Sequence, residues 1–301
     1  MMSNATHNID GAGILAKIRE CQDRTHPNNT IPFIVEGRTI GYVFPHFALK
    51  LAPFDDVFEV EEGRNVRLVE TLSTPEEKTE AMERVTIQLR DEGVIRGWRG
   101  EKYEVKDRFQ EQPCFFIERA AAKYFGLKTW GIHVNGYVKK TDGSLLMWVA
   151  KRSMTKPTYP GMLDHIVAGG QPAGISAFQN LQKECKEEAT INDNLSSMAC
   201  CVGMVPYYCC RDTRGLIRDT ILVYDLQLPE SFTPTPCDGE VESFQLHNIE
   251  EVVQMVLETS NFKPNVTLVL IDFFIRHGVL TVDSTDYYED IIQALQDTSL
   301  F

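Results

Sequence analysis

The feature that most constrains the fold is a glycine-rich turn followed at once by a helix start. Residues 168–191 read AGGQPAGISAFQNLQKECKEEATI. Ser176, with Gln179 three positions later, forms a capping box, so the helix begins just after Gly174. Because glycine has no Cβ, such a turn lets backbone carbonyls approach a group beside the helix.

The helix that follows carries apolar and acidic side chains at helical spacing. The apolar positions predict a buried stripe of Phe178, Leu181, Cys185 and Ala189. The acidic positions fall within one turn on a different face, at Glu184, Glu187 and Glu188. Like charges so placed repel one another unless cations neutralise them, and grouped oxygen ligands suit Mg²⁺ or Mn²⁺. The alternative is a solvated acidic helix end screened by neighbouring lysines, and the adjoining glycine turn favours the metal.

The segment resembles the Nudix hydrolase signature, G-x5-E-x7-R-E-U-x-E-E-x-G-U, where U is a bulky aliphatic residue. With Gly169 as the first glycine, the glutamates of the REUxEE core fall on Glu184, Glu187 and Glu188. The resemblance implies that these carboxylates hold catalytic Mg²⁺ or Mn²⁺, with the carbonyl of Ala168 as a further ligand. The chain departs from the pattern at Ile175, Lys183, Cys185 and Thr190. In the family the missing glutamate and arginine form a supporting ion pair, so these departures affect the bracing of the helix more than its metals.

A narrower resemblance covers nearly the whole chain. Its strings are IPFIVEGRTIGYVFPHFALKL from residue 31, WVAKRSMTKPTYPGMLDHIVAGGQPAGIS from residue 148 and YDLQLPESFTPTPCDGEVESF from residue 224. They are similar to Nudix proteins related to the N-terminal part of fungal thiamine pyrophosphokinase. The resemblance implies hydrolysis of thiamine diphosphate, and preferentially of its oxidised oxo and oxy analogues, to the monophosphates.

The pattern of elements predicts an α/β (α+β) fold in which a small α+β domain, residues 1–127, precedes a Nudix domain, residues 128–301. The first of these domains is favoured by a short helix at 14–21, a hairpin at 33–44 and a capped helix from 74 to about 93. Alternating apolar residues, a turn at 142–143 and three late helices favour a mixed sheet with helices on both faces, the Nudix α/β/α sandwich.

The candidate catalytic residues are Glu187 and Glu240. Glu184 and Glu188 are the principal expected metal ligands, and Glu187 is a ligand or the general base. Many Nudix enzymes take the base from a loop outside the signature helix, and the loop DGEVESF offers Glu240 for that role. The alternative for Glu240 is a solvated carboxylate in a turn.

Several residues are candidates for binding a diphosphate substrate. Arg152 and Lys156 lie at the end of a predicted strand, where long cationic side chains reach a terminal phosphate. Arg214 is a second possible clamp, and Asp164 either contacts substrate or pins its loop. His165 is expected to be a hydrogen-bonded loop imidazole, not a metal ligand.

Composition limits the class of partner. Lys and Arg number 30 against 43 Asp and Glu, and the net charge of −13 disfavours nucleic-acid binding. No stretch reads as a membrane span or a secretory signal, and the scattered cysteines suit a reduced compartment, so a cytoplasmic protein is expected. The expected partner is a small-molecule diphosphate, and the N-terminal domain could shape specificity or mediate a homodimer.

Other functions stay open at this point. The same chemistry could act on ADP-ribose or another nucleoside diphosphate derivative, or the chain could be a non-catalytic ligand-binding Nudix module. An isopentenyl diphosphate isomerase is disfavoured because the loop before the signature carries Ala168 and no nearby cysteine.

Overall fold

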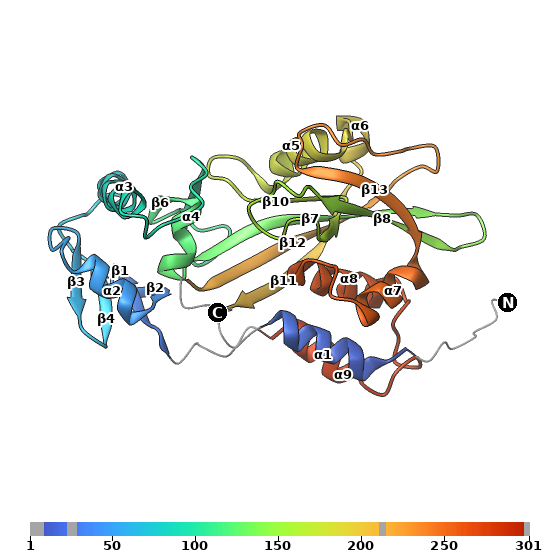
Figure 1. Ribbon diagram of the computed structural model, residues 1–301, viewed down its shortest axis with the longest axis horizontal. Coiled ribbons are helices and arrows are strands. Elements are labelled where there is room, and N and C mark those ends of the chain that lie inside the picture. Colours follow the sequence, from blue (N-terminus) through green and yellow to red (C-terminus); the bar gives the residue numbers. More distant parts are fainter. Residues whose placement is uncertain (1–8, 23–28, 211–214, 298–301) are drawn as a thin grey trace.

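The computed structural model describes residues 9–22, 29–210 and 215–297. In this part of the chain a smaller body with a four-stranded sheet adjoins a larger body with a seven-stranded sheet (Figure 1). A two-stranded ribbon of β5 (Lys102–Val105) and β6 (Phe115–Glu118) belongs to the segment that joins them.

The smaller sheet has the strand order β2-β1-β4-β3. Its strands are β1 (Ile31–Val35), β2 (Arg38–Val43), β3 (Phe58–Glu61) and β4 (Asn65–Leu68), with α2 (Pro45–Leu51) between β2 and β3. The predicted turn lies at Glu36 and Gly37, whose φ angles are 51° and 73°. α3 (Pro75–Asp91) begins at the predicted capping box, because Thr74 accepts from the backbone N–H of Glu77, whose carboxylate accepts from that of Thr74.

A cluster of phenylalanines packs the end of the joining segment into the core of the smaller body. The rings of Phe33 and Phe58 each lie about 5–6 Å from Phe125, at 5.2 and 6.1 Å between centroids. Phe125 follows α4 (Arg119–Ala122) and ends the 3-10 turn η2 (Lys123–Phe125). The next residue, Gly126, has φ 54°, and a Cβ there would meet the carbonyl oxygen of Tyr42 at 2.2 Å. Only glycine fits this close approach between β2 and the residues that lead into β7.

The larger sheet is mixed and lies between two layers of helices (Figure 1). Its path is β11-β12-β7-β8-β13, with β10 paired to β7 and β9 paired to β8. The strands are β7 (Lys128–Lys139), β8 (Leu145–Arg152), β9 (Leu163–His165), β10 (Val167–Gly170), β11 (Cys200–Cys209), β12 (Ile217–Gln227) and β13 (Val241–Asn248). β7 and β12 run parallel, and the other pairs are antiparallel. α5 (Ala177–Ala189) and α6 (Asp193–Ser196) cover one face, while α7 (Ile249–Glu258) and α8 (Pro264–Arg276) cover the other. This arrangement confirms the predicted fold class.

The first helix, α1 (Gly11–Cys21), does not pack where the sequence placed it. Its buried Ile14, Leu15 and Ile18 share a core with α7, α8 and α9 (Tyr288–Leu295) (Figure 1). The helix predicted to open the smaller domain therefore packs on the far layer of the larger body. For the elements after α1, the domain boundary between residues 127 and 128 stays a proposal.

The signature helix α5 begins at the predicted capping box of Ser176 and Gln179. Leu181, Cys185 and Ala189 are fully buried as predicted, whereas Phe178 is 40% exposed. Asn180 is buried instead, because its amide donates to the carbonyl oxygen of Gly170 at 2.9 Å. Asn180 therefore faces the end of β10, at a position where the predicted stripe had no member, and Phe178 lies partly in solvent.

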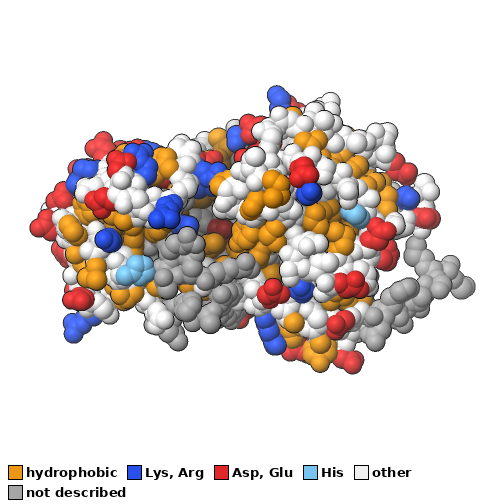
Figure 2. Space-filling model, in the orientation of Figure 1, with side chains coloured by type: hydrophobic (Ala, Val, Ile, Leu, Met, Phe, Trp, Pro, Cys, Tyr) orange, Lys and Arg blue, Asp and Glu red, His pale blue; other side chains and the backbone are white. Residues whose placement is uncertain are grey.

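The described helices include none with the length and apolar character needed to cross a bilayer. Over the face drawn in Figure 2, acidic and basic side chains both occur on each body.

Candidate active site

A cavity of about 410 Å³ opens where β7, β10, β12 and α5 meet the segment that joins the two bodies. Its walls include most of the candidates from the sequence: Arg152, Lys156, Ala168, Glu184, Glu187 and Glu240. The walls also include four residues that precede the proposed boundary between residues 127 and 128: Arg99, Glu101, Tyr103 and Arg119. The larger body and the segment that precedes the proposed boundary therefore build the same cavity.

The turn between β10 and α5 brings the carboxylates of Glu184 and Glu188 against the strand. The backbone N–H of Ala168 donates to Oε2 of Glu188 at 2.9 Å. A Cβ on Gly169 would lie 2.5 Å from the carboxyl carbon of Glu184. Glycine at this position is what lets the Glu184 side chain lie so close to the strand.

These two carboxylates are costly to keep charged without a cation. Burial raises the pKa of Glu188 well above its usual value, and the hydrogen bond from Ala168 offsets only part of this effect. Burial also raises the pKa of Glu184, against the opposing charge of Lys183. Glu187 differs, since its side chain is half exposed and pairs with Lys183 at 3.2 Å.

The loop before β13 adds two more carboxylates to the site. One oxygen each from Glu188, Asp238 and Glu240 lie within 4.8 Å of one another. Lys156 donates to Glu240. Burial raises the pKa of Glu240, but the hydrogen bond and charge of Lys156 outweigh it and leave the pKa below its usual value. Grouped carboxylate oxygens around a buried carboxylate fit a hard divalent cation such as Mg²⁺ or Mn²⁺.

Arg152 and Asp164, both expected near the substrate, form a buried ion pair. Nη1 of Arg152 lies 2.7 Å from the Asp164 carboxylate, and the other guanidinium nitrogens donate to the carbonyls of Thr158 and Tyr159. Burial raises the pKa of Asp164, but Lys263 and the other surrounding cations outweigh it and hold the pKa well below its usual value. In this geometry the pair braces the loop between β8 and β9, the second of the two roles considered for Asp164. Arg214 lies outside the described residues.

His165 lies on β9, not on a loop, and has an unexpected partner. Its Nδ1 is 2.9 Å from Nδ1 of His133 on β7. Burial lowers the pKa of His165 to about 4 and that of His133 well below its usual value, so both rings are neutral at pH 7. The prediction of a hydrogen-bonded imidazole is consistent with this contact, but the partner is another histidine from a strand far away in sequence.

Sequence reasoning missed the contribution of the start of α8. Lys263 and Asn265 line the cavity, and Lys263 lies 3.7 Å from the Asp164 carboxylate. Asn265 is 7% exposed, and its Oδ1 has no hydrogen-bond partner among the described residues. Asp219 on β12 also lines the cavity, where burial raises its pKa. No spacing in the sequence connects these positions to the signature, because the sheet alone brings them together.

Comparison with known proteins identifies the family. A family model described as a domain of unknown function, DUF4743, matches residues 13–129. Nudix hydrolase 24, chloroplastic, of Arabidopsis thaliana is 44% identical over 287 residues, covering 93% of this chain and 77% of the relative. Nudix hydrolase 20, chloroplastic, of the same plant is 42% identical over 302 residues, covering 96% and 79%. A crystal structure of a Deinococcus radiodurans protein is 17% identical with a TM-score of 0.43, covering 58% of this chain and 100% of that protein.

These relatives also correct one prediction. The cytoplasmic location expected from the composition is contradicted, since both Arabidopsis relatives are chloroplastic proteins. Identity at this level over nearly the whole chain shows that the chain belongs to the Nudix hydrolases, enzymes that hydrolyse phosphorus-containing acid anhydrides, and two of the signature carboxylates, Glu184 and Glu187, line the cavity.

Proposed function

We propose that the protein is a divalent-cation-dependent diphosphatase that converts thiamine diphosphate and its oxidised oxo and oxy analogues to the monophosphate and phosphate. The observation that carries the diphosphatase chemistry is the buried carboxylate of Glu188, whose oxygen lies within 4.8 Å of those of Asp238 and Glu240. The charged form of such a buried carboxylate is favourable only if a cation shares it. What supports the thiamine substrate is the set of sequence strings that spans both bodies.

The proposed metal ligands are Glu184, Glu187 and Glu188, with the carbonyl of Ala168. To these we add Asp238, because its carboxylate lies beside that of Glu188. A divalent cation bound here would lower the pKa of a water molecule that it binds, and it would neutralise charge on the phosphates.

We assign Glu240 as the general base. Its carboxylate lines the cavity and accepts from Lys156, so it is held in place and oriented. In the proposed step the carboxylate takes a proton from water while the water oxygen attacks the terminal phosphorus. The bond from that phosphorus to the bridging oxygen then breaks, and the monophosphate leaves.

The cations of the cavity supply the phosphate contacts in this proposal. Lys156 and Lys263 reach the same space from the β8–β9 loop and the start of α8, and Arg119 reaches it from the N-terminal side. We retain Arg152 as a cavity residue that acts mainly through the loop it braces. Because acidic and basic groups share the walls, the site suits a small phosphate ester and not a polyanion.

The test is a substrate panel with Mg²⁺ or Mn²⁺: thiamine diphosphate, oxothiamine diphosphate and ADP-ribose, with products separated by chromatography. We expect monophosphate from the thiamine compounds, and at least about a hundredfold loss of activity in Glu188→Gln. Glu242→Gln is the matched control, since Glu242 lies two residues after Glu240, at the start of β13, but is exposed and pairs with Lys151 at 2.8 Å. Turnover of ADP-ribose alone would keep the chemistry and reject the thiamine substrate. Binding of these ligands without any turnover would reject the enzyme in favour of a ligand-binding module.

A homodimer also stays a proposal, and sedimentation velocity of the purified protein tests it.

A further inference from the structure

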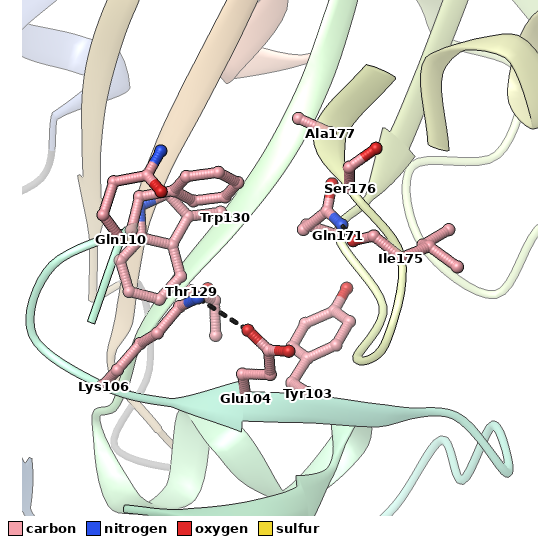
Figure 3. A pocket seen from close by; sticks show the side chains of 11 residues that line it. Tyr103, Glu104, Lys106, Gln110, Thr129, Trp130, Gln171, Ile175, Ser176 and Ala177 are labelled. Atoms are coloured by element: carbon pink, nitrogen blue, oxygen red, sulfur yellow. Dashed lines mark hydrogen bonds and ion pairs between the residues drawn. The ribbon is translucent and has the colours of Figure 1, made fainter. Parts of the chain in front are cut away.

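A second, smaller cavity of about 260 Å³ adjoins the active site. The rings of Tyr103 and Trp130 line both spaces. On one side of the smaller cavity stand residues of β5 and the turn after it, and on the other side stands the glycine-rich loop that leads into α5 (Figure 3). The loop that positions the signature carboxylates is therefore also a wall of this second space.

The walls of this second cavity differ in kind from those of the first. Phe109 packs edge-on against Trp130, with 5.9 Å between the ring centroids. Nζ of Lys106 lies over both rings, 5.0 Å from the centroid of Phe109 and 5.6 Å from that of Trp130. Aromatic faces of this kind attract planar ring systems. In contrast, charged side chains dominate the walls of the first cavity.

Polar groups at fixed positions complete the second cavity. Glu104 accepts from Lys106 at 2.6 Å, so its carboxylate is held at the edge of the space (Figure 3). Across from it, the amide nitrogen of Gln171 donates to the carbonyls of Pro172 and Ile175, at 3.2 and 2.8 Å. These two contacts fix the amide so that its oxygen is the acceptor, and that oxygen has no partner among the described residues. The Glu104 carboxylate at this edge therefore offers an acceptor to a ring that carries N–H donors, while that Gln171 oxygen is itself buried.

We propose that this cavity, built by Tyr103, Glu104, Lys106, Phe109, Trp130 and Gln171, is the specificity subsite for a planar heteroaromatic group on the substrate. The inference rests on the proposed function, since the diphosphate of the same molecule lies in the adjoining site. A volume of about 260 Å³ suits one part of a ligand and not the whole of a drug-sized molecule. The shared walls of Tyr103 and Trp130 place the two parts next to each other.

This assignment gives the N-terminal region a role in recognition. Glu104, Lys106 and Phe109 all precede the proposed domain boundary, and they line the same cavity as Gln171, Ile175 and Ser176 of the loop that leads into α5. A Nudix body without this segment would keep its carboxylates and lose one side of the subsite. Substrate choice is then a joint property of both bodies.

The experiment compares Phe109→Ala with Phe178→Ala. Phe178 is an exposed phenylalanine on α5 that lines neither cavity, so it controls for the loss of a ring elsewhere. Two readouts are taken: KM and kcat for thiamine diphosphate and ADP-ribose, and binding of thiamine and adenosine, which lack the diphosphate, by equilibrium dialysis. Thermal unfolding of each variant verifies that it is folded, and Glu104→Gln provides a second variant with no change in volume.

For Phe109→Ala we expect about a tenfold rise in KM for the ring-bearing substrate with little change in kcat, and a similar loss of affinity for the free ring compound. Phe178→Ala should behave as the parent. Glu104→Gln should weaken ring binding in the same direction.

The two proposals fail in different ways. Parent-like KM and ring binding in both Phe109→Ala and Glu104→Gln, with an active parent, would overturn the subsite alone. If the parent binds the ring compounds but hydrolyses none of these diphosphates, and Phe109→Ala weakens that binding, the subsite is supported and the proposed function is rejected. A parent that neither binds the ring compounds nor turns over their diphosphates would overturn both.

Discussion

Replacing Gly169 with alanine tests how tightly the glycine turn positions Glu184. The added Cβ would lie 2.5 Å from the carboxyl carbon of Glu184 and 2.8 Å from its Cγ and Oε1, whereas ordinary contact begins at 3.4 Å. The carboxylate must therefore retreat by about 0.9 Å, the difference between 3.4 and 2.5 Å. Misplacement of a catalytic group by about 1 Å costs roughly a hundredfold in rate, or about 2.7 kcal/mol.

We expect Gly169→Ala to lower kcat/KM about a hundredfold and to change the melting temperature little, since the displaced side chain borders an open cavity. Steady-state kinetics with thiamine diphosphate, or with whichever diphosphate the panel identifies, measures kcat/KM. Differential scanning calorimetry measures the melting temperature. Gly13→Ala is the matched control, because its Cβ would also meet a carboxylate, that of Asp10, at 2.5 Å, in a helix remote from the cavity. It should keep the parent's kinetics.

A double-mutant cycle identifies the route of the effect. In a Glu184→Ala background the alanine at position 169 has no carboxylate to displace, so Gly169→Ala should cost little more. A further hundredfold loss in that background would refute the reasoning, because the effect would then not pass through Glu184.

Three further predictions concern groups that hold the scaffold. Arg152→Met should lower the free energy of unfolding by about 3 kcal/mol in urea titrations, because Asp164 loses its hydrogen-bonded partner and keeps only the more distant Lys263. Lys151→Met, from an exposed pair, should cost less than about 1 kcal/mol. Thr74→Ala should cost about 1 kcal/mol by the same measurement, since it removes half of the capping box of α3, and equal stability would mean that the cap contributes nothing. Burial raises the pKa of Asp225, but hydrogen bonds from His277, Arg276 and Asn135 outweigh it and lower the pKa from 3.8 to about 2. A depressed carboxyl pKa stabilises the fold above pH 3.8, and this stabilisation, about 2 kcal/mol, should be lost as the pH falls toward 2 in the parent but not in Asp225→Asn.

Local signals in the sequence predicted the elements and the centre of the site. The capping box at Ser176, the box at Thr74 and the turn at Glu36 and Gly37 are contacts between residues a few positions apart, so their spacing is visible in the chain. The signature carboxylates share one helix for the same reason, and two of them, Glu184 and Glu187, line the cavity.

Contacts made by the sheet could not be predicted in this way. His133 meets His165 only because β7 and β8 pair with β10 and β9, and Lys263 enters the site only because α8 packs under the same sheet. The helix α1 has an amphipathic pattern that predicts burial but not the partner, which is why its place on the larger body was missed. Phe178 was assigned to the core by periodicity alone, whereas a hydrogen bond from Asn180 to Gly170 rotates the helix away from that choice.

The central claim is that the carboxylates around Glu188 exist to hold a divalent cation. Titration of the protein with Mn²⁺, followed by electron paramagnetic resonance of the free ion, measures this without any substrate. The account predicts saturable binding in the parent and in Glu242→Gln, and at least about tenfold weaker binding in Glu188→Gln and in Asp238→Asn. Mn²⁺ affinity that is the same in all four proteins, or no binding by the parent, would contradict it.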